Sequence, residues 1–275
     1  MNLVSTMIAA LLLSTAAVAD PETEWPDAEP VIEAQGDIDL SLYKLSFSEE
    51  FDRLSVSGRR CDSRWIAHTP WNGDFGGAAF ADPSRGFPFK TRRGVLRIEA
   101  RKISSDEWLA GLLSLRNTCD KGFAQLYGYF EARMMLPAED GMWSAFWLIG
   151  VDRDMATAEV DVMEHLGHMP DRYTTALHLH PRVETVERLD AGSAVNAEEG
   201  ALSKGFNTFG VSVEEKETIF YFNRREIWRQ PTTPEFRQPM YPIVNLAMDR
   251  GYISADTPER AYLYVDYVRV YQRKP

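Results

Sequence analysis

Three carboxylates fall close together near the middle of the chain, in the stretch Glu159-Val-Asp161-Val162-Met163-Glu164. Side chains of a β-strand alternate between its two faces, so Glu159 and Asp161 would share one face while the valines enter an apolar layer. Strict alternation would turn Glu164 to the opposite face, but a β-bulge at Val162 and Met163 would return it. The spacing predicts three acids on one side of a bulged strand.

Like charges on one face repel each other and raise at least one pKa, which leaves a protonated acid beside an ionised carboxylate. Glycoside hydrolysis needs this pair. Carboxyl groups about 5 to 5.5 Å apart retain the anomeric configuration, whereas a wider gap admits a water and inverts it. The short spacing favours retention. Trp143 and Trp147, just upstream, offer flat apolar faces that suit the C–H faces of sugar rings.

The same residues also allow a helix with a solvated acidic edge, because Glu, Ala and Met are good helix formers. The period of two and the lack of a capping signal favour the strand. Whether the acids are catalytic or form a solvated charged face is left open by the pattern alone.

The elements that would position these acids are short strands with no long helical stripe. Turn signals separate the strands at Asn72-Gly73, Gly76-Gly77, Arg93-Gly94 and Asn223-Arg224. The fold class is therefore all-β, with two curved antiparallel sheets as the economical way to bury so many strands. Besides the acidic stretch, the alternating segments are Leu45–Phe51, Val95–Ala100, Phe123–Met135, Thr174–His180, Phe209–Val213, Ile219–Phe222 and Tyr262–Tyr271.

The chain divides into a signal peptide over residues 1–19, an extended lead-in over 20–40 and one domain over 41–275. The apolar run Met7–Leu13 precedes Ala17-Val18-Ala19, an A-x-A pattern that predicts cleavage after Ala19 and export to the periplasm or the medium. The run is too short to span a bilayer, so we expect no membrane association after cleavage. No Lys or Arg precedes the run, and an uncleaved anchor is the weaker alternative. The lead-in is rich in Pro, Glu and Asp and has no apolar period.

The composition, with 44% hydrophobic and 12% aromatic residues, is that of a globular protein. The net charge of −11 argues against nucleic acid as a partner, because nucleic acid is bound through Lys and Arg on phosphates. A neutral polysaccharide is the expected partner, and we expect a monomer. Cys61 and Cys119 are the two cysteines, and in an exported protein we favour a disulfide over two buried thiols.

Several segments resemble glycoside hydrolase family 16, beginning with the acidic stretch, which resembles the family's E-x-D-x-x-E signature in its bulged form. The resemblance covers about Phe47 to Tyr271 and implies a concanavalin A-like β-jelly roll with a cleft across its concave sheet. It also implies that Glu159 is the nucleophile, Glu164 the general acid and base, and Asp161 the helper between them. The other matching blocks, in the family's order, are Tyr127–Arg133, Leu136-Pro137, Gly141–Gly150, Phe206–Phe209, Asn223–Glu226 and Val265–Tyr271.

The resemblance assigns substrate contacts to Trp143, Trp147 and His178, with a looser match for Trp71 on a cleft-edge loop. An alternative interpretation of Trp147 is an aromatic residue of the hydrophobic core, because Phe146 and Leu148 are its neighbours. His178 shares a face with His180, and we expect His178 to hydrogen-bond the sugar or the acids rather than a metal.

The resemblance further implies a structural calcium ion at Glu50, Gly94 and Asp266, although catalysis needs no cofactor. Carboxylate and carbonyl oxygens are the ligands that calcium prefers.

The resemblance indicates a retaining endo-β-glycanase that acts on a β-1,3- or β-1,3/1,4-linked glucan or a bacterial exopolysaccharide of the succinoglycan type. Many β-1,3-glucanases have serine-glycine-arginine where this chain has Ala110-Gly111-Leu112, which argues against strict laminarin specificity. The alternatives are an agar- or carrageenan-type galactan hydrolase, a transglycosylase of the same family, and a carbohydrate-binding module without catalysis.

Overall fold

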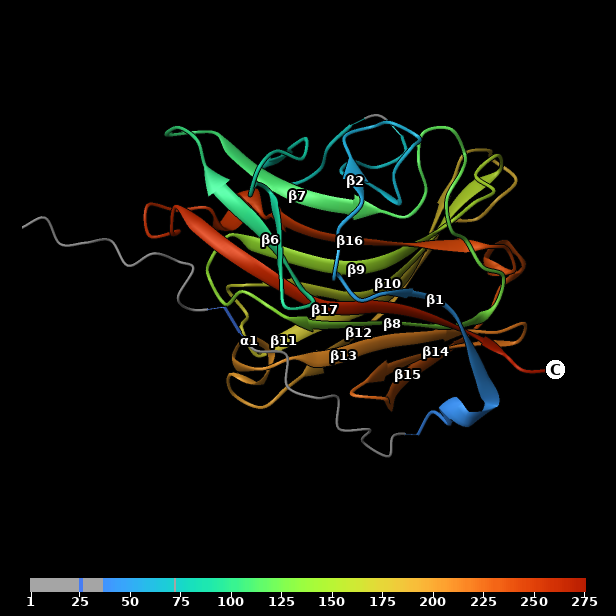
Figure 1. Ribbon diagram of the computed structural model, residues 1–275. Coiled ribbons are helices and arrows are strands. Elements are labelled where there is room, and N and C mark those ends of the chain that lie inside the picture. The colour runs from blue at the N-terminus through green and yellow to red at the C-terminus, as the bar shows by residue number, and fades with distance from the viewer. Residues whose placement is uncertain (1–24, 27–36, 72) are drawn as a thin grey trace, which may run out of the picture.

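The computed structural model describes residues 25–26, 37–71 and 73–275. The predicted signal peptide over 1–19, most of the lead-in and Asn72 lie outside the described residues. Almost all regular structure in the described part is β-strand, arranged in two curved sheets that lie face to face (Figure 1). The predicted fold class is confirmed.

The outer sheet is antiparallel, and β1 (Tyr43–Glu49) pairs with the C-terminal half of its long strand β17. From one edge to the other its strands are β5 (Phe89–Arg92), β6 (Val95–Lys102), β17 (Arg260–Arg273), β8 (Gly128–Met135), β13 (Asn207–Val213), β14 (Glu217–Phe222) and β15 (Arg225–Pro231).

The second sheet, here called the site sheet, carries the acidic stretch on β10 near its centre. β7 pairs with β6 at one end and with β16 at the other, so it joins the two sheets. In order, the strands of the site sheet are β7 (Trp108–Ser114), β16 (Met240–Met248), β9 (Met142–Gly150), β10 (Ala156–Leu166), β11 (Arg172–Pro181) and β12 (Leu189–Asn196).

Short elements complete the described chain. β2 (Val56–Ser57) pairs in parallel with β3 (Trp65–Ile66), while β4 (Ala79–Phe80) pairs in parallel with β7. The helical segments are α1 (Ala201–Lys204), η2 (Leu40–Leu42), η3 (Pro234–Phe236) and η4 (Arg250–Tyr252). Among the residues described, no helix has the length and apolar character needed to cross a membrane.

All seven predicted strands are present, with ends shifted by a few residues, but the one predicted to begin at Phe123 begins at Gly128. Tyr127 and Gly128 have φ angles of 58° and 119°, which interrupt an extended run. Several strands were not predicted, among them β5, β7, β12, β15 and β16. β12 is an edge strand with few β-forming residues, and β16 contains Pro242.

Apolar side chains from both sheets fill the space between them. Val160 and Leu148 on the site sheet, and Phe130 and Phe209 on the outer sheet, are fully buried in one continuous core. This core holds the inward face of β10 by hydrophobic burial, worth roughly 1.5 to 3 kcal/mol for each large side chain. The opposite face of β10 is left for polar residues.

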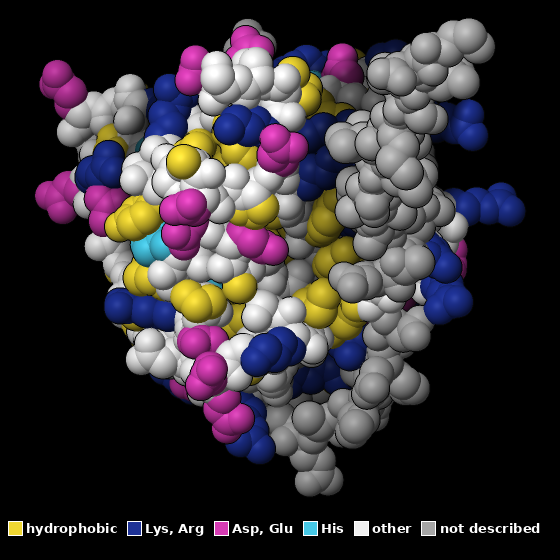
Figure 2. All heavy atoms as spheres, turned by 90° about the vertical axis from the view of Figure 1, so that its left-hand side faces the viewer, with side chains coloured by type: hydrophobic (Ala, Val, Ile, Leu, Met, Phe, Trp, Pro, Cys, Tyr) yellow, Lys and Arg dark blue, Asp and Glu magenta, His cyan; other side chains and the backbone are white. Residues whose placement is uncertain are grey.

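The far side of the outer sheet is also covered. The buried carboxylate of Glu131 accepts two hydrogen bonds of 3.0 Å from Arg224 and one of 2.7 Å from each of Tyr129 and Tyr267. Ile38 packs over Tyr129, so the lead-in contributes to packing from its last residues. On the side of the molecule seen in Figure 2, acidic and basic side chains are interspersed.

A disulfide joins Cys61 to Cys119, with 6.1 Å between their Cα atoms, and confirms the favoured pairing. The bridge ties the loop after β2 to the loop after β7. In the same region Thr118 Oγ1 donates to the carbonyl of Arg59, and Arg59 donates to the carbonyl of Trp71 at 3.2 Å. The disulfide therefore anchors the segment that leads to the cleft-edge loop at Trp71.

We predict that the double substitution Cys61→Ser and Cys119→Ser lowers the free energy of unfolding by about 4 kcal/mol, because the closed loop restricts the unfolded chain. Denaturation by guanidinium chloride, followed by tryptophan fluorescence, measures the difference. Wild-type protein in reductant should match the variant, and the variant itself should not respond to reductant. A wild-type midpoint that reductant leaves unchanged would contradict the role given to this bridge.

Candidate active site

The centre of β10 contains one residue more than its neighbour on β9. Asp161 lies opposite Trp147 and Met163 lies opposite Phe146, so β10 uses two residues where β9 uses one. Val162 is the extra residue, and it is buried together with Met163. The predicted bulge at Val162 and Met163 is therefore present.

The pairing with β11 shows the same shift. Asp161 lies opposite Ala176 and Glu164 lies opposite Thr174, so β10 advances by one more residue than β11. The hydroxyl of Thr175 donates to the carbonyl oxygen of Asp161 at 3.0 Å, within the region where the ladder is irregular. The bulge is thus held from β11 as well as from the core.

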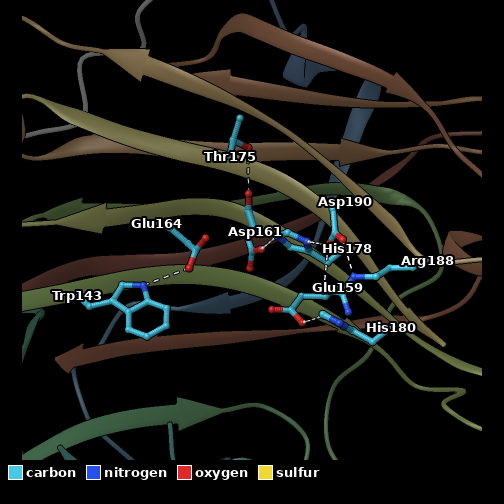
Figure 3. Close-up of polar contacts among 9 residues, drawn as sticks. All are labelled: Trp143, Glu159, Asp161, Glu164, Thr175, His178, His180, Arg188 and Asp190. Atoms are coloured by element: carbon cyan, nitrogen blue, oxygen red, sulfur yellow. Dashed lines mark hydrogen bonds and ion pairs between the residues drawn. The ribbon is translucent and has the colours of Figure 1, made fainter. Parts of the chain in front are cut away.

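The bulge brings the three acids to one face, as predicted. Glu159, Asp161 and Glu164 line a pocket of about 130 Å³. Figure 3 shows their carboxylates on the same side of the sheet, with Asp161 between the other two. The remaining lining residues are Phe75, Trp143, Ala145, Trp147 and Asn245.

The three carboxylates differ in their surroundings. Asp161 is 4% exposed, and burial together with the charges of Glu159 and Glu164 raises the pKa of Asp161 well above its ordinary value. A hydrogen bond with Glu159 adds to this rise in the pKa of Asp161. The protonated form of Asp161 is therefore favoured.

Burial also raises the pKa of Glu164, while the indole N–H of Trp143 opposes this effect and the charge of Glu159 reinforces it. Trp143 Nε1 donates to Glu164 Oε1 at 3.1 Å. The net rise in the pKa of Glu164 favours its protonated form. An acid that begins protonated can release a leaving group.

Two histidines from β11 approach the acids. His178 Nε2 lies 3.3 Å from Asp161 Oδ2, and its Nδ1 lies 2.7 Å from Asp190 Oδ1 on β12. His180 Nε2 lies 2.9 Å from Glu159 Oε2, and this contact raises the pKa of His180. Both imidazole rings contact the acids, whereas only His178 was predicted to do so.

The two tryptophans of β9 reach the pocket in different ways. Trp143 is partly exposed beside Glu164, whereas Trp147 is 6% exposed and donates to Asn245 Oδ1 at 2.8 Å. Phe75 contacts both indoles edge to face, with ring centroids 5.5 Å and 5.9 Å away. Trp147 is therefore part of the core and part of the pocket lining at once.

Trp71 lies one layer further from the acids and does not line their pocket. Its ring meets Trp147 edge to face at 6.1 Å, and the guanidinium carbon of Arg153 lies 4.3 Å from its centroid. The cleft-edge segment Trp71–Gly77 does reach the pocket, but through Phe75. A sugar contact at Trp71 stays a prediction.

Sequence reasoning missed Phe75, His180, Asp190 and Asn245. Asn245 is the one polar side chain in an apolar strand, which was a usable signal, and His180 follows His178 with period two. Asp190 carried no signal, because its place beside His178 depends on the pairing of β11 with β12.

The predicted calcium residues are engaged in other contacts. Both carboxylate oxygens of Glu50 accept from Arg269, at 2.9 and 2.8 Å, and Asp266 accepts from Arg133 at 2.6 Å. A Cβ on Gly94 would lie 3.4 Å from the carbonyl oxygen of Glu50, so these two backbones are close. A cation here would have to rely on backbone carbonyls, because the carboxylates are already paired. Calcium binding stays a prediction.

The amino-acid sequence is similar to those of known proteins. The family model for glycosyl hydrolases family 16 matches residues 95–269. Endo-1,3-1,4-beta-glycanase ExsH of Rhizobium meliloti (strain 1021) is 30% identical over 260 residues, which cover 85% of this chain and 53% of that protein. Endo-1,3-1,4-beta-glycanase EglC of the same strain is 29% identical over 257 residues, with the same coverage. The chain thus spans about half the length of these curated relatives.

Solved structures agree on the fold. The laminarinase from Rhodothermus marinus has a TM-score of 0.67 at 23% identity, over 85% of this chain and 98% of that one. This structural similarity shows a shared fold. The family model and the two relatives, in contrast, match the amino-acid sequence. The model spans the bulged strand with its three acids and the strands on either side. The chain belongs to glycosyl hydrolases family 16.

Proposed function

We propose that this protein is an exported, retaining endo-β-glycanase that hydrolyses a β-1,3- or β-1,3/1,4-linked glucan or a bacterial exopolysaccharide of the succinoglycan type. The single observation that supports this function best is the bulge in β10, which gathers Glu159, Asp161 and Glu164 around one pocket. The names of the two Rhizobium meliloti relatives support the glucan linkages. The A-x-A pattern before Asp20 supports export.

In the first step of the proposed reaction, a carboxylate oxygen of Glu159 attacks the anomeric carbon of the bound sugar. The bond from that carbon to the glycosidic oxygen breaks, and Glu164 donates its proton to the leaving oxygen. Glu159 now forms an ester with the sugar. The raised pKa of Glu164 keeps the required proton available at the start.

In the second step, water attacks the same carbon and the ester bond to Glu159 breaks. Glu164 accepts a proton from the water, so both residues return to their initial forms and the configuration is retained. Asp161 donates a hydrogen bond to Glu159, which orients the nucleophile and helps to disperse its charge as it is released. Interception of the ester by a sugar hydroxyl would give transglycosylation instead.

The aromatic walls of the pocket suit a sugar bound across the strands. Trp143 and Phe75 present partly exposed rings, and apolar ring faces pack well on the C–H faces of pyranoses. A galactan of the agar or carrageenan type would also present such faces. Packing on these aromatic rings therefore does not distinguish a glucan from a galactan.

We predict that Glu159→Gln lowers kcat at least on the order of 10³-fold, because the amide cannot form the covalent intermediate. Initial rates on the best polysaccharide measure the loss, and circular dichroism checks the fold. Glu215→Gln, an exposed glutamate next to β14, is the matched control and should keep wild-type activity. A Glu159→Gln variant with wild-type kcat would remove Glu159 from the mechanism.

The two glutamates can be told apart by azide rescue of alanine variants on an activated aryl β-oligoglycoside. Glu159→Ala with azide should release an α-glycosyl azide, because azide attacks in place of the nucleophile. Glu164→Ala should release a β-glycosyl azide, because azide then attacks the intact ester. Proton NMR of the product reads the anomer, and the opposite assignment of anomers would reverse the two roles.

We predict that Trp143→Phe moves the basic limb of the pH profile of kcat/KM to higher pH. The indole N–H stabilises ionised Glu164 and so lowers its pKa; without it the pKa of Glu164 rises, and the acid form persists to higher pH. Trp228→Phe on β15 of the outer sheet is the control. A basic limb that stays in place or moves down would contradict the role of this hydrogen bond.

A panel of laminarin, lichenan, succinoglycan and agarose tests the substrate class. We expect reducing ends from at least one of the first three, with agarose at least about 10-fold slower, and a viscosity that falls early because cleavage is internal. Preference for agarose would indicate the galactan hydrolase. Binding to a polysaccharide without any release of reducing ends would indicate the binding module.

A further inference from the structure

Asp190, on the edge strand β12, lies in one row with His178 on β11 and Glu159 on β10. The Cα positions of Glu159 and His178 are direct partners, and so are those of His178 and Asp190. His178 links the two sides, with Nδ1 2.7 Å from Asp190 Oδ1 and Nε2 3.3 Å from Asp161 Oδ2. Figure 3 shows the imidazole between the two aspartates.

The carboxylate of Asp190 is held by Arg188. Arg188 Nε lies 2.5 Å from Asp190 Oδ2, and its terminal nitrogen lies 3.4 Å from Oδ1. The hydrogen bonds from Arg188 and then His178 lower the pKa of Asp190 to about 2, so Asp190 is ionised at neutral pH. An ionised carboxylate only accepts hydrogen bonds, and Nδ1 of His178 must therefore carry the hydrogen.

A neutral imidazole with hydrogen on Nδ1 has a lone pair on Nε2. That lone pair faces Asp161, the acid whose raised pKa favours its protonated form. The single hydrogen on Asp161 can then point either to Glu159 or to Nε2 of His178, and Asp161 stays protonated in both cases. The opposite tautomer would present an N–H to Asp161, which would favour its ionised form and remove the hydrogen that Asp161 donates to Glu159.

The titratable groups around His178 are mainly acidic. The titratable groups that face it come from three strands and are Glu159, Asp161 and Glu164 on β10, His180 on β11 with its ring stacked at 5.8 Å, and Asp190 on β12. Of these, Asp190 is the one that contacts Nδ1. Asp190 therefore determines which tautomer His178 adopts.

We propose that Asp190 is a positioning residue, held by Arg188, that keeps His178 in the tautomer with hydrogen on Nδ1, so that Nε2 presents a lone pair instead of an N–H to Asp161 and Asp161 stays protonated. Its effect on turnover rests on the function proposed above. The tautomer itself does not, because it is a property of the free protein.

Asp190→Asn is the sharpest test, since Arg188 has only donors and will take the amide oxygen. The amide NH₂ is then left to face Nδ1, which drives His178 to the tautomer with hydrogen on Nε2. Asp190→Ala removes the partner altogether and is the second variant. Glu187→Gln, an exposed acid in the same β11–β12 connection, is the matched control.

Nitrogen-15 NMR of histidine-labelled protein at neutral pH distinguishes a protonated from an unprotonated ring nitrogen, and loss of signals in His178→Asn assigns the residue. We expect hydrogen on Nδ1 in wild type and Glu187→Gln, and hydrogen on Nε2 in Asp190→Asn. In the same variant kcat should fall on the order of 10-fold with KM nearly unchanged, because Asp190 acts through His178 and Asp161 and not on the substrate.

Hydrogen on Nε2, or on both nitrogens, in the wild-type protein would overturn the proposal. So would an unchanged tautomer in Asp190→Asn, or a switched tautomer with wild-type kcat. If wild-type protein cleaves no polysaccharide of the panel, the proposed function fails, while the nitrogen shifts of His178 still decide this inference.

Discussion

The central constraint on this structure is the repulsion among three carboxylates that share one face of β10. Crowded acids on one strand cost free energy, and most strands avoid them. Here the inward-facing neighbours on β10, including Val160 and Met163, are fully buried and anchor the strand in the core. The acids cannot move apart, so the repulsion is relieved by protons and hydrogen bonds instead.

A different contact reduces the electrostatic repulsion at each acid. Glu164 accepts a hydrogen bond from the indole N–H of Trp143, and Glu159 contacts His180. The raised pKa of Asp161 favours its protonated, uncharged form. These differences turn three similar side chains into groups with separate roles. Neighbouring strands supply every partner, which is why the site lies in the middle of a sheet and not on a loop.

The rest of the fold follows from holding that sheet rigid. β9 and β16 place Trp147 against Asn245, and the outer sheet closes the core beneath them. The disulfide fastens the segment that leads to the cleft edge. In the reaction proposed for this protein, two carboxyl groups must be held at a close and constant separation, and a rigid sheet meets that need.

Local pattern determined much of this protein. Alternation in Glu159–Glu164 favoured a strand over a helix and predicted its bulge, since only an extra residue lets Glu164 join Glu159 and Asp161. The same periodicity predicted an all-β fold of two sheets, and the two cysteines, together with the predicted export, favoured a disulfide over two buried thiols. These features depend on neighbours in sequence or on simple counting.

Only the tertiary structure decided which distant side chains complete the site. Phe75, Asn245 and Asp190 come from other segments, and their contacts depend on sheet order and register, which local sequence does not encode. The pairing of Glu50 with Arg269 and of Asp266 with Arg133 is of the same kind. Proton positions on the acids also depend on burial and on charges from several strands, so they became accessible only when the sheets were assembled.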